Sequence, residues 1–502
     1  MTAALAQTER STSRRRRRGG YRFWLRVQRA LAIGALCAVL PFAAGGQNEL
    51  PDFGDSASAT LSPADERELG AFFMRQIRAQ LPVVNDPEIE GYIQNLGYSL
   101  VSGASQGTTN FHFFVIADPV VNAFAIPGGY IGVHSGLIAN TESESELASV
   151  MAHEIAHVTQ RHIARAIAAA EGTQYATLAA VIAGILIGTQ NSQAGQAAIA
   201  GASAAGAQSQ INFTRTNEKE ADRVGIAMLA KAGYNPRAMP TFFEKLDTAS
   251  RYYSRPPEFL STHPVTTSRI ADSRGRAEQY PYKQYVDSMS YGLMRAKLRV
   301  TTTDSPARVL ANYEAELKEE RAGDRSPVLY GRALALARLG KSERASEELR
   351  KLVATHPERV RFRVALAKQQ LASGNIEQAL ATYQDTYGLF PDSKQLVRAY
   401  VDALLRNDKG ERALVILDDY SRLYAKDATL YRLEAEAFRQ TGKVMNSRMA
   451  LAEHYYRNGE LNAAIHQLQL ASNEPGGDFY QNSRLDARLK ELKTERDFLM
   501  RR

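Results

Sequence analysis

The chain has 502 residues, enough for two or three domains with their own cores, and its 44% hydrophobic and 23% charged content is ordinary for a globular protein. Its formal net charge of +8 arises within the first 30 residues, which contain nine arginines and one acid, Glu9. Because the remainder is close to neutral, the composition gives no electrostatic case for nucleic acid as a partner.

Residues 1–45 have the pattern of a signal peptide for export. Five consecutive arginines precede a short apolar run, ALAIGALCAVLPF, that is followed by the small residues AAGG. The run is too short to span a bilayer comfortably, so we expect cleavage after Ala44 or Gly45; an uncleaved membrane anchor is the alternative. The chain's one cysteine, Cys37, lies in this segment. The mature chain would therefore have no thiol for catalysis or for zinc binding.

A polar linker over 46–60 leads into a segment that predicts two helices, then strands, then a long helix. The first helix has Ser62 as N-cap and Pro63 at its first position, and the long helix starts with a capping box from Thr141 to Glu144. The strand region is rich in aromatic and β-branched residues and is broken at Pro127. In chain order, these elements occupy residues 62–80, 85–103, 111–118, 122–138 and 141–168.

The sequence HEIAH, residues 153–157, lies inside the long predicted helix. His153 and His157 are four apart, so both side chains leave the same face and can reach one metal ion. Glu154 is then placed to accept a proton from a metal-activated water and pass it to the leaving amine. Because HExxH also occurs by chance, the motif needs a third ligand elsewhere in the chain.

That third ligand is not supplied by an extension of the same helix. A metzincin would have a histidine six residues after the second, where this chain has Ile163. His162, five residues after His157, is expected on roughly the opposite side of the helix, and we interpret it as a packing or surface residue. In the predicted helix 216–234, Glu218 and Asp222 share one face. Glu218 is our candidate third ligand, and Asp222 is placed to accept a hydrogen bond from a ligand imidazole. Glu220 should face away.

A further histidine, His263, precedes Pro264 and is expected in an extended loop. Two roles stay open for it: a fourth, displaceable ligand that closes the metal site, or a donor that stabilises the oxyanion of the tetrahedral intermediate. Arg269, six residues on, is a weaker candidate to act together with it.

Residues 164–212 are rich in Ala, Gly and Gln around an apolar centre, ATLAAVIAGILIG. The centre is short of the roughly 20 residues that a spanning helix needs. We expect a helical hairpin or lid that packs on the body, with peripheral membrane contact as the alternative.

From about residue 290 the sequence repeats with a period of 34 residues. Alanines mark this period at positions 311, 345, 379 and 413, glycines at 340 and 374, and prolines at 357 and 391. Small residues at helix crossings and proline after the second helix are typical of tetratricopeptide repeats. Near the end the spacing halves, with 17 residues between Gly442 and Gly459. The pattern predicts stacked helix pairs whose curved surface binds protein segments.

Taken together, HEIAH, the helix with Glu218 and Asp222, the STHP segment before SRI, and the NAFAIPGG stretch resemble the gluzincin family of the CAAX prenyl protease and the HtpX heat-shock protease. Exported members with C-terminal tetratricopeptide repeats are most similar. The resemblance implies a periplasmic zinc endopeptidase with one zinc ion per chain on His153, His157 and Glu218, and with Glu154 in catalysis. It also implies that NAFAIPGG forms an edge strand to which substrate adds.

The resemblance further implies protein quality control: degradation of misfolded or stalled outer-membrane β-barrel proteins and help in their assembly, with repeats that contact substrate or the assembly machinery. The expected fold class is α+β and mostly helical. A zincin-type protease domain with a small sheet (61–285) precedes an all-α repeat solenoid (290–502). The alternative function is a chaperone or adaptor that acts through its repeats, with a latent zinc site occluded at His263.

Overall fold

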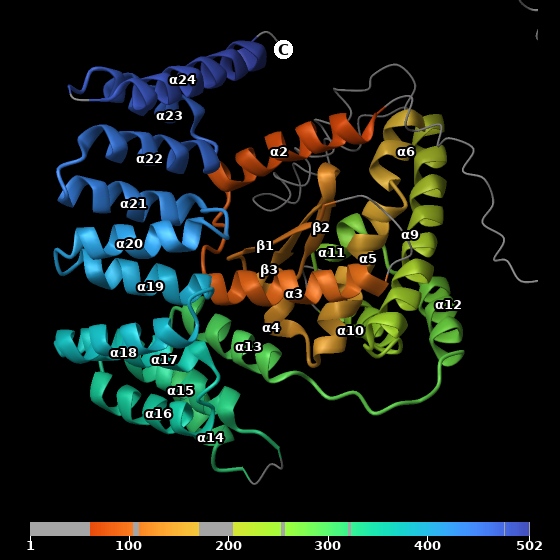
Figure 1. The fold of residues 1–502 in the computed structure, drawn as a ribbon. Coiled ribbons are helices and arrows are strands. Elements are labelled where there is room, and N and C mark those ends of the chain that lie inside the picture. Colours follow the sequence, from red (N-terminus) through yellow and green to blue (C-terminus); the bar gives the residue numbers. More distant parts are fainter. Residues whose placement is uncertain are drawn as a thin grey trace, which may run out of the picture. The chain divides into compact units, whose positions relative to one another are not determined.

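The computed structural model describes residues 61–103, 110–169, 204–252, 257–319, 323–475 and 477–500 (Figure 1). The expected signal peptide, the linker and the apolar centre of the 164–212 segment lie outside these residues, so the helical hairpin or lid expected there stays a prediction, with membrane contact as its alternative. Among the residues that are described, we find no helix with the length and apolar character of a membrane span.

The fold class is confirmed: the described chain is mostly helical, with one small sheet in its N-terminal half. Strands β1 (His112–Ile116), β2 (Ala123–Ile126) and β3 (Tyr130–His134) lie in the order β1-β3-β2. β3 pairs parallel with β1 and antiparallel with β2, so β2 is an edge strand. The break that we expected at Pro127 separates β2 from β3, because Gly128 and Gly129 turn the chain with φ of 78° and 82°.

The helices around this sheet pack against it in two hydrophobic clusters. α5 (Glu144–Thr159) packs against α3 (Pro87–Gly103), α9 (Ala204–Ala232) and the sheet, and Figure 1 shows α5 and α9 side by side. These helices are α2 (Pro63–Gln80), α3 (Pro87–Gly103), α4 (Ser135–Asn140), α5 (Glu144–Thr159), α6 (His162–Ala169), α9 (Ala204–Ala232), α10 (Ala238–Tyr252), α11 (Phe259–Thr262) and α12 (Thr267–Glu278).

The long helix predicted over 141–168 is wrong at both ends. Its N-cap is Ser143, whose side chain accepts from the Glu146 amide, and not Thr141. The helix also stops at Thr159, and the chain turns through Arg161 with φ of +52° before α6 begins. A left-handed arginine is strained, but its guanidinium nitrogen Nη2 donates to the Leu61 carbonyl and the Glu66 carboxylate, both at 2.7 Å. Contacts with Leu61 and with Glu66 of α2 therefore hold a turn that the local sequence does not favour.

The predicted repeats appear as a succession of helices from residue 289 to 500. They are α13 (Met289–Thr301), α14 (Pro306–Glu316), α15 (Ser326–Arg338), α16 (Ser342–Thr355), α17 (Val360–Ala372), α18 (Ile376–Leu389), α19 (Lys394–Leu405), α20 (Gly410–Ser421), α21 (Ala428–Gln440), α22 (Val444–Arg457), α23 (Leu461–Ser472) and α24 (Phe479–Met500). Consecutive helices pack on one another along this stretch.

The 34-residue period marks the turn inside each helix pair. Gly340, Gly374, Asp408 and Gly442 are spaced by 34 and all have positive φ, so Asp408 adopts the conformation that glycine has in the other repeats. The alanines at 345, 379 and 413 are fully buried in the helices that follow, whereas Ala311 is exposed. The first unit therefore departs from the pattern.

α13 belongs to two cores. Tyr291, Met294 and Leu298 pack with the sheet and α3, whereas Ala296 and Val300 pack with α14 and α15. The expected boundary between the domains, at 285–290, lies just before this shared helix and stays a prediction.

Candidate metal centre

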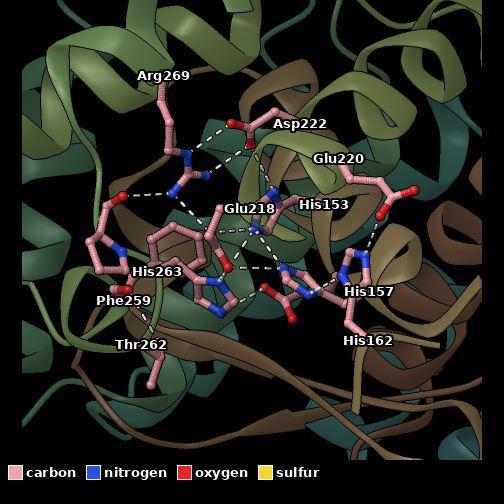
Figure 2. Close-up of polar contacts among 12 residues, drawn as sticks. His153, His157, His162, Glu218, Glu220, Asp222, Phe259, Thr262, His263 and Arg269 are labelled. Carbon is pink, nitrogen blue, oxygen red and sulfur yellow. Dashed lines mark hydrogen bonds and ion pairs between the residues drawn. The ribbon is translucent and has the colours of Figure 1, made fainter. Parts of the chain in front are cut away.

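Three elements bring the predicted ligands together. His153 and His157 leave one face of α5, Glu218 extends from α9, and His263 caps the end of α11 (Figure 2). One potential ligand atom from each of these four side chains lies within 4.8 Å of the others. His153, Glu218 and His263 are buried, and His157 is partly exposed.

The distances fit one tetrahedral metal ion. Nε2 of His153 lies 3.0 Å from Nε2 of His157 and 3.3 Å from Oε2 of Glu218. Nδ1 of His263 lies 3.0 Å from Oε1 of Glu218. Ligand atoms around a zinc-sized ion with bonds of about 2.1 Å are about 3.4 Å apart. Several nitrogen lone pairs that converge in a buried space are costly without a cation to share, so this set of donors suits a metal.

Glu154 lies at the edge of the cluster. Its side chain is 1% exposed, and its Oε1 lacks a hydrogen-bond partner among the described residues, although Nε2 of His263 is 3.4 Å away. A buried carboxylate oxygen with free lone pairs beside a metal site is suited to accept a proton from a bound water.

Asp222 and Arg269 support the cluster from behind. Asp222 lies 3.0 Å from Nδ1 of His153, the nitrogen that faces away from the other ligands, as we expected. Arg269 makes two 2.8 Å contacts with Asp222, and its Nη1 lies 2.8 Å from Glu218 and donates to the Pro264 carbonyl. The predicted link between Arg269 and His263 is therefore indirect: the arginine holds the backbone next to the histidine.

The electrostatics favour a cation in the cluster. Although burial disfavours a charged imidazole, Glu218 and Asp222 raise the pKa of His153 to about 9. Burial also opposes ionisation of Glu218, but the facing histidines His263 and His153 hold its pKa well below the usual range. A buried carboxylate that stays ionised over such a range is a strong cation ligand.

His162 contacts the ligand cluster, and Glu220 contacts His162, in a way that our interpretation of the sequence did not predict. His162 is buried, and its Nδ1 lies 2.8 Å from Nδ1 of His157. Its Nε2 lies 3.2 Å from Glu220, which we expected to face away. The turn at Arg161 folds His162 back toward the ligand, and because that turn contains neither Gly nor Pro, no local pattern reveals it.

Known families match the same regions. The model for Peptidase family M48 matches residues 87–277, which include all four clustered side chains. A tetratricopeptide-repeat model matches 370–437, and a model for a bacterial transcriptional activator domain matches 308–393.

Similar proteins match over nearly the whole chain. The putative beta-barrel assembly-enhancing protease of Vibrio cholerae is 38% identical over 477 residues, which cover 95% of this chain and 98% of that protein. The beta-barrel assembly-enhancing protease of Escherichia coli is 36% identical over 464 residues, with 92% and 94% covered. Mitochondrial metalloendopeptidase OMA1 of Schizosaccharomyces pombe is 28% identical over 179 residues, with 36% and 50% covered.

These matches confirm the resemblance from the sequence. Because two relatives above 30% identity align over both the protease and the repeat regions, the chain belongs to metallopeptidase family M48, together with the beta-barrel assembly-enhancing proteases that it resembles.

Proposed function

We propose that the chain is a zinc-dependent endopeptidase of the periplasm that degrades misfolded or stalled outer-membrane β-barrel proteins and assists their assembly. The observation that carries the proposal is the convergence of His153, His157 and Glu218 beside the buried carboxylate of Glu154. The substrate class and the compartment follow from the names of the relatives and from the export pattern at the N-terminus.

His153, His157 and Glu218 would hold one zinc ion, which when bound supplies the Lewis acidity that activates water and stabilises negative charge on the substrate carbonyl. Glu154 accepts the proton of the attacking water and delivers it to the leaving amine. Asp222 keeps the hydrogen of His153 on Nδ1, so that Nε2 is free to bind the metal.

The edge strand β2 offers a place for substrate. Its side opposite β3 pairs with no strand in the described part of the chain, and β2 packs against α5, the helix that carries Glu154. An extended peptide that adds to this edge gains backbone hydrogen bonds whatever its sequence. Such binding suits a protease for unfolded chains.

The second candidate function is a chaperone or adaptor that acts through the repeats while the metal site stays closed. One observation favours it: His263 lies among the ligands, 3.3 Å from Nε2 of His153, where it would fill the fourth coordination position. A histidine in that position excludes the water that hydrolysis needs.

Zinc content and cleavage of an unfolded outer-membrane β-barrel protein, measured together, test both functions. We expect Glu154→Gln to retain zinc and lose cleavage, whereas Glu142→Gln, at an exposed glutamate before α5, should behave as wild type. If His263→Ala cleaves faster than wild type, the histidine closes the site. A wild-type protein that binds no zinc would contradict the enzyme proposal.

A further inference from the structure

The outer nitrogen of His157 faces a second histidine. Nε2 of His157 points at the ligand cluster, 3.3 Å from Glu218, while its Nδ1 lies 2.8 Å from Nδ1 of His162 (Figure 2). Nε2 of His162 continues to Glu220 at 3.2 Å, and Nη1 of Arg165 holds the same Glu220 oxygen at 2.9 Å. The three side chains thus form a line that starts at a metal ligand and ends at a carboxylate.

Only one placement of the ring hydrogens allows both hydrogen bonds, His157 to His162 and His162 to Glu220, while His157 binds metal. Nε2 of His157 must be bare to act as a ligand, so the ring hydrogen sits on Nδ1. That hydrogen is donated to Nδ1 of His162, which must then be an acceptor. The hydrogen of His162 is therefore on Nε2, where the Glu220 carboxylate accepts it.

We propose that His162 is a positioning residue for the metal site: with Glu220 behind it, His162 fixes the tautomer and the ring orientation of His157. This inference rests on the proposed zinc site and assigns a support to its second histidine. The first histidine, His153, has its own support in Asp222. The two ligands of HEIAH are thus held by different means, one by a carboxylate and one by a histidine that relays to a carboxylate.

The backbone supports this role. An uninterrupted helix would place His162 on the side of α5 opposite His157, and the left-handed turn at Arg161 removes that separation. The strained turn lies directly before His162, the first residue of α6, and His162 is 4% exposed. Backbone strain of this kind is often found beside functional residues. Glu220 comes from α9, the helix that also carries Glu218. The line therefore joins α5, α6 and α9 at the ligand.

The test is the zinc dissociation constant of the full chain, measured by competition with a chelator, together with the melting temperature of the metal-free protein. His162→Phe keeps a buried ring but removes both hydrogen bonds, and we expect zinc binding to weaken about 10- to 100-fold. His162→Gln retains an acceptor and a donor and should recover much of that loss. The control is His112→Phe, at an exposed histidine stacked on Tyr130, which should leave zinc binding unchanged.

Glu220→Ala tests the second step without altering a buried ring. Alone it should weaken zinc binding less than His162→Phe does, and in the His162→Phe background it should add nothing, because Glu220 acts through the histidine. Additive losses would contradict the relay.

The results separate this inference from the proposed function. A wild-type chain without zinc affinity overturns the zinc site itself. Wild-type zinc affinity in His162→Phe overturns the positioning role alone. If His162→Phe and His162→Gln both lower the melting temperature of the metal-free protein and have the same zinc dissociation constant as each other, the hydrogen bonds of His162 do not affect zinc binding. His162 is then only a packing residue. Should His162→Phe fail to fold, Glu220→Ala with unchanged zinc affinity would overturn the relay.

Discussion

Arg269 makes more contacts with the site than its place in the sequence suggests. The residue is 2% exposed, and its guanidinium lies between two buried carboxylates, those of Asp222 and Glu218. Although burial disfavours its charge, the hydrogen bond to Asp222 raises the pKa of Arg269. The arginine thus permits two acids to be buried beside one histidine cluster, and it also ties the segment before α12 to the site through the Pro264 carbonyl.

Arg269→Met should destabilise the metal-free protein by about 3–5 kcal/mol, because it leaves buried carboxylates without their partner. Chemical denaturation measures this loss. Arg274→Met, at an exposed arginine of the same helix, is the matched control and should change stability by about 0.5 kcal/mol or less. Equal effects of the two substitutions would mean that Arg269 contributes no more than a surface residue.

At the scale of elements, the packing of α2 on the turn between β2 and β3 positions the edge strand. A Cβ atom at Gly70 would lie 2.0 Å from the carbonyl oxygen of Pro127, which is backbone and cannot rotate away. On the other side of this contact, Gly128 has φ of 78° and approaches the backbone of Glu66. Glycine is required at both positions because two backbones meet.

Gly70→Ala should therefore destabilise the protein by about 1–3 kcal/mol through overpacking, and it should slow peptide cleavage by displacing the start of β3. Gly91→Ala, inside α3, is the control, because a Cβ there meets nothing within 4 Å. That control should be neutral or stabilising by up to about 1 kcal/mol, since alanine favours helix. Thermal unfolding and a cleavage assay distinguish the two; a Gly70→Ala protein as stable as wild type would contradict the close approach.

At the scale of the whole described unit, a buried group of charges joins the N-terminal half to the repeats. Glu88 of α3 is 4% exposed and accepts from Nζ of Lys297 on α13 at 2.8 Å and from the hydroxyl of Tyr330 on α15 at 3.0 Å. Lys297 also donates to Asp86 at 2.8 Å. Further along the repeats, Lys394 reaches Glu90 at 3.1 Å. Because these charges are buried, removal of one partner would leave the other without a counter-charge and destabilise the junction.

Lys297→Met should cost about 3–5 kcal/mol of stability near neutral pH, because Glu88 and Asp86 lose their shared cation. Lys351→Met, at an exposed lysine that pairs within α16, should cost about 0.5 kcal/mol or less. Denaturant unfolding of both variants measures the difference. If Lys297→Met were no worse than its control, the junction would be held by apolar packing alone.

The same junction predicts the pH range over which its charges stabilise the folded protein. Burial opposes ionisation of Asp86, but Lys297 lowers the pKa of Asp86 below the ordinary 3.8. The contribution of Asp86 to the free energy of unfolding is therefore present above pH 3.8 and is lost as the pH falls through the lower folded pKa. Burial likewise opposes the charge of Lys297, but Glu88 and Asp86 raise the pKa of Lys297 above 10.5. The contribution of Lys297 to the free energy of unfolding is therefore lost only as the pH rises through the higher folded pKa. The stability difference between wild type and Lys297→Met should be largest between these limits and should shrink in acid. A difference that does not vary from pH 7 into acid would contradict this account.

Features that depend on local geometry alone could be predicted from the sequence. The spacing of four between His153 and His157 puts both on one helical face in any helix, and the 34-residue period marked the positions of the repeated turns. Composition and strand propensity likewise predicted a mostly helical chain with a small sheet. These features follow from backbone periodicities that each segment carries with it.

Three features could not be predicted in this way: the turn at Arg161, the contact of His162 with His157, and the position of Arg269 behind the ligands. Each depends on partners far along the chain: Leu61 and Glu66 hold the turn about 100 residues away, and Asp222 holds Arg269 from 47 residues away. A left-handed arginine costs energy locally and persists only because distant contacts offset the strain. The local sequence carries no trace of such contacts, so helix spacing alone put His162 on the wrong side.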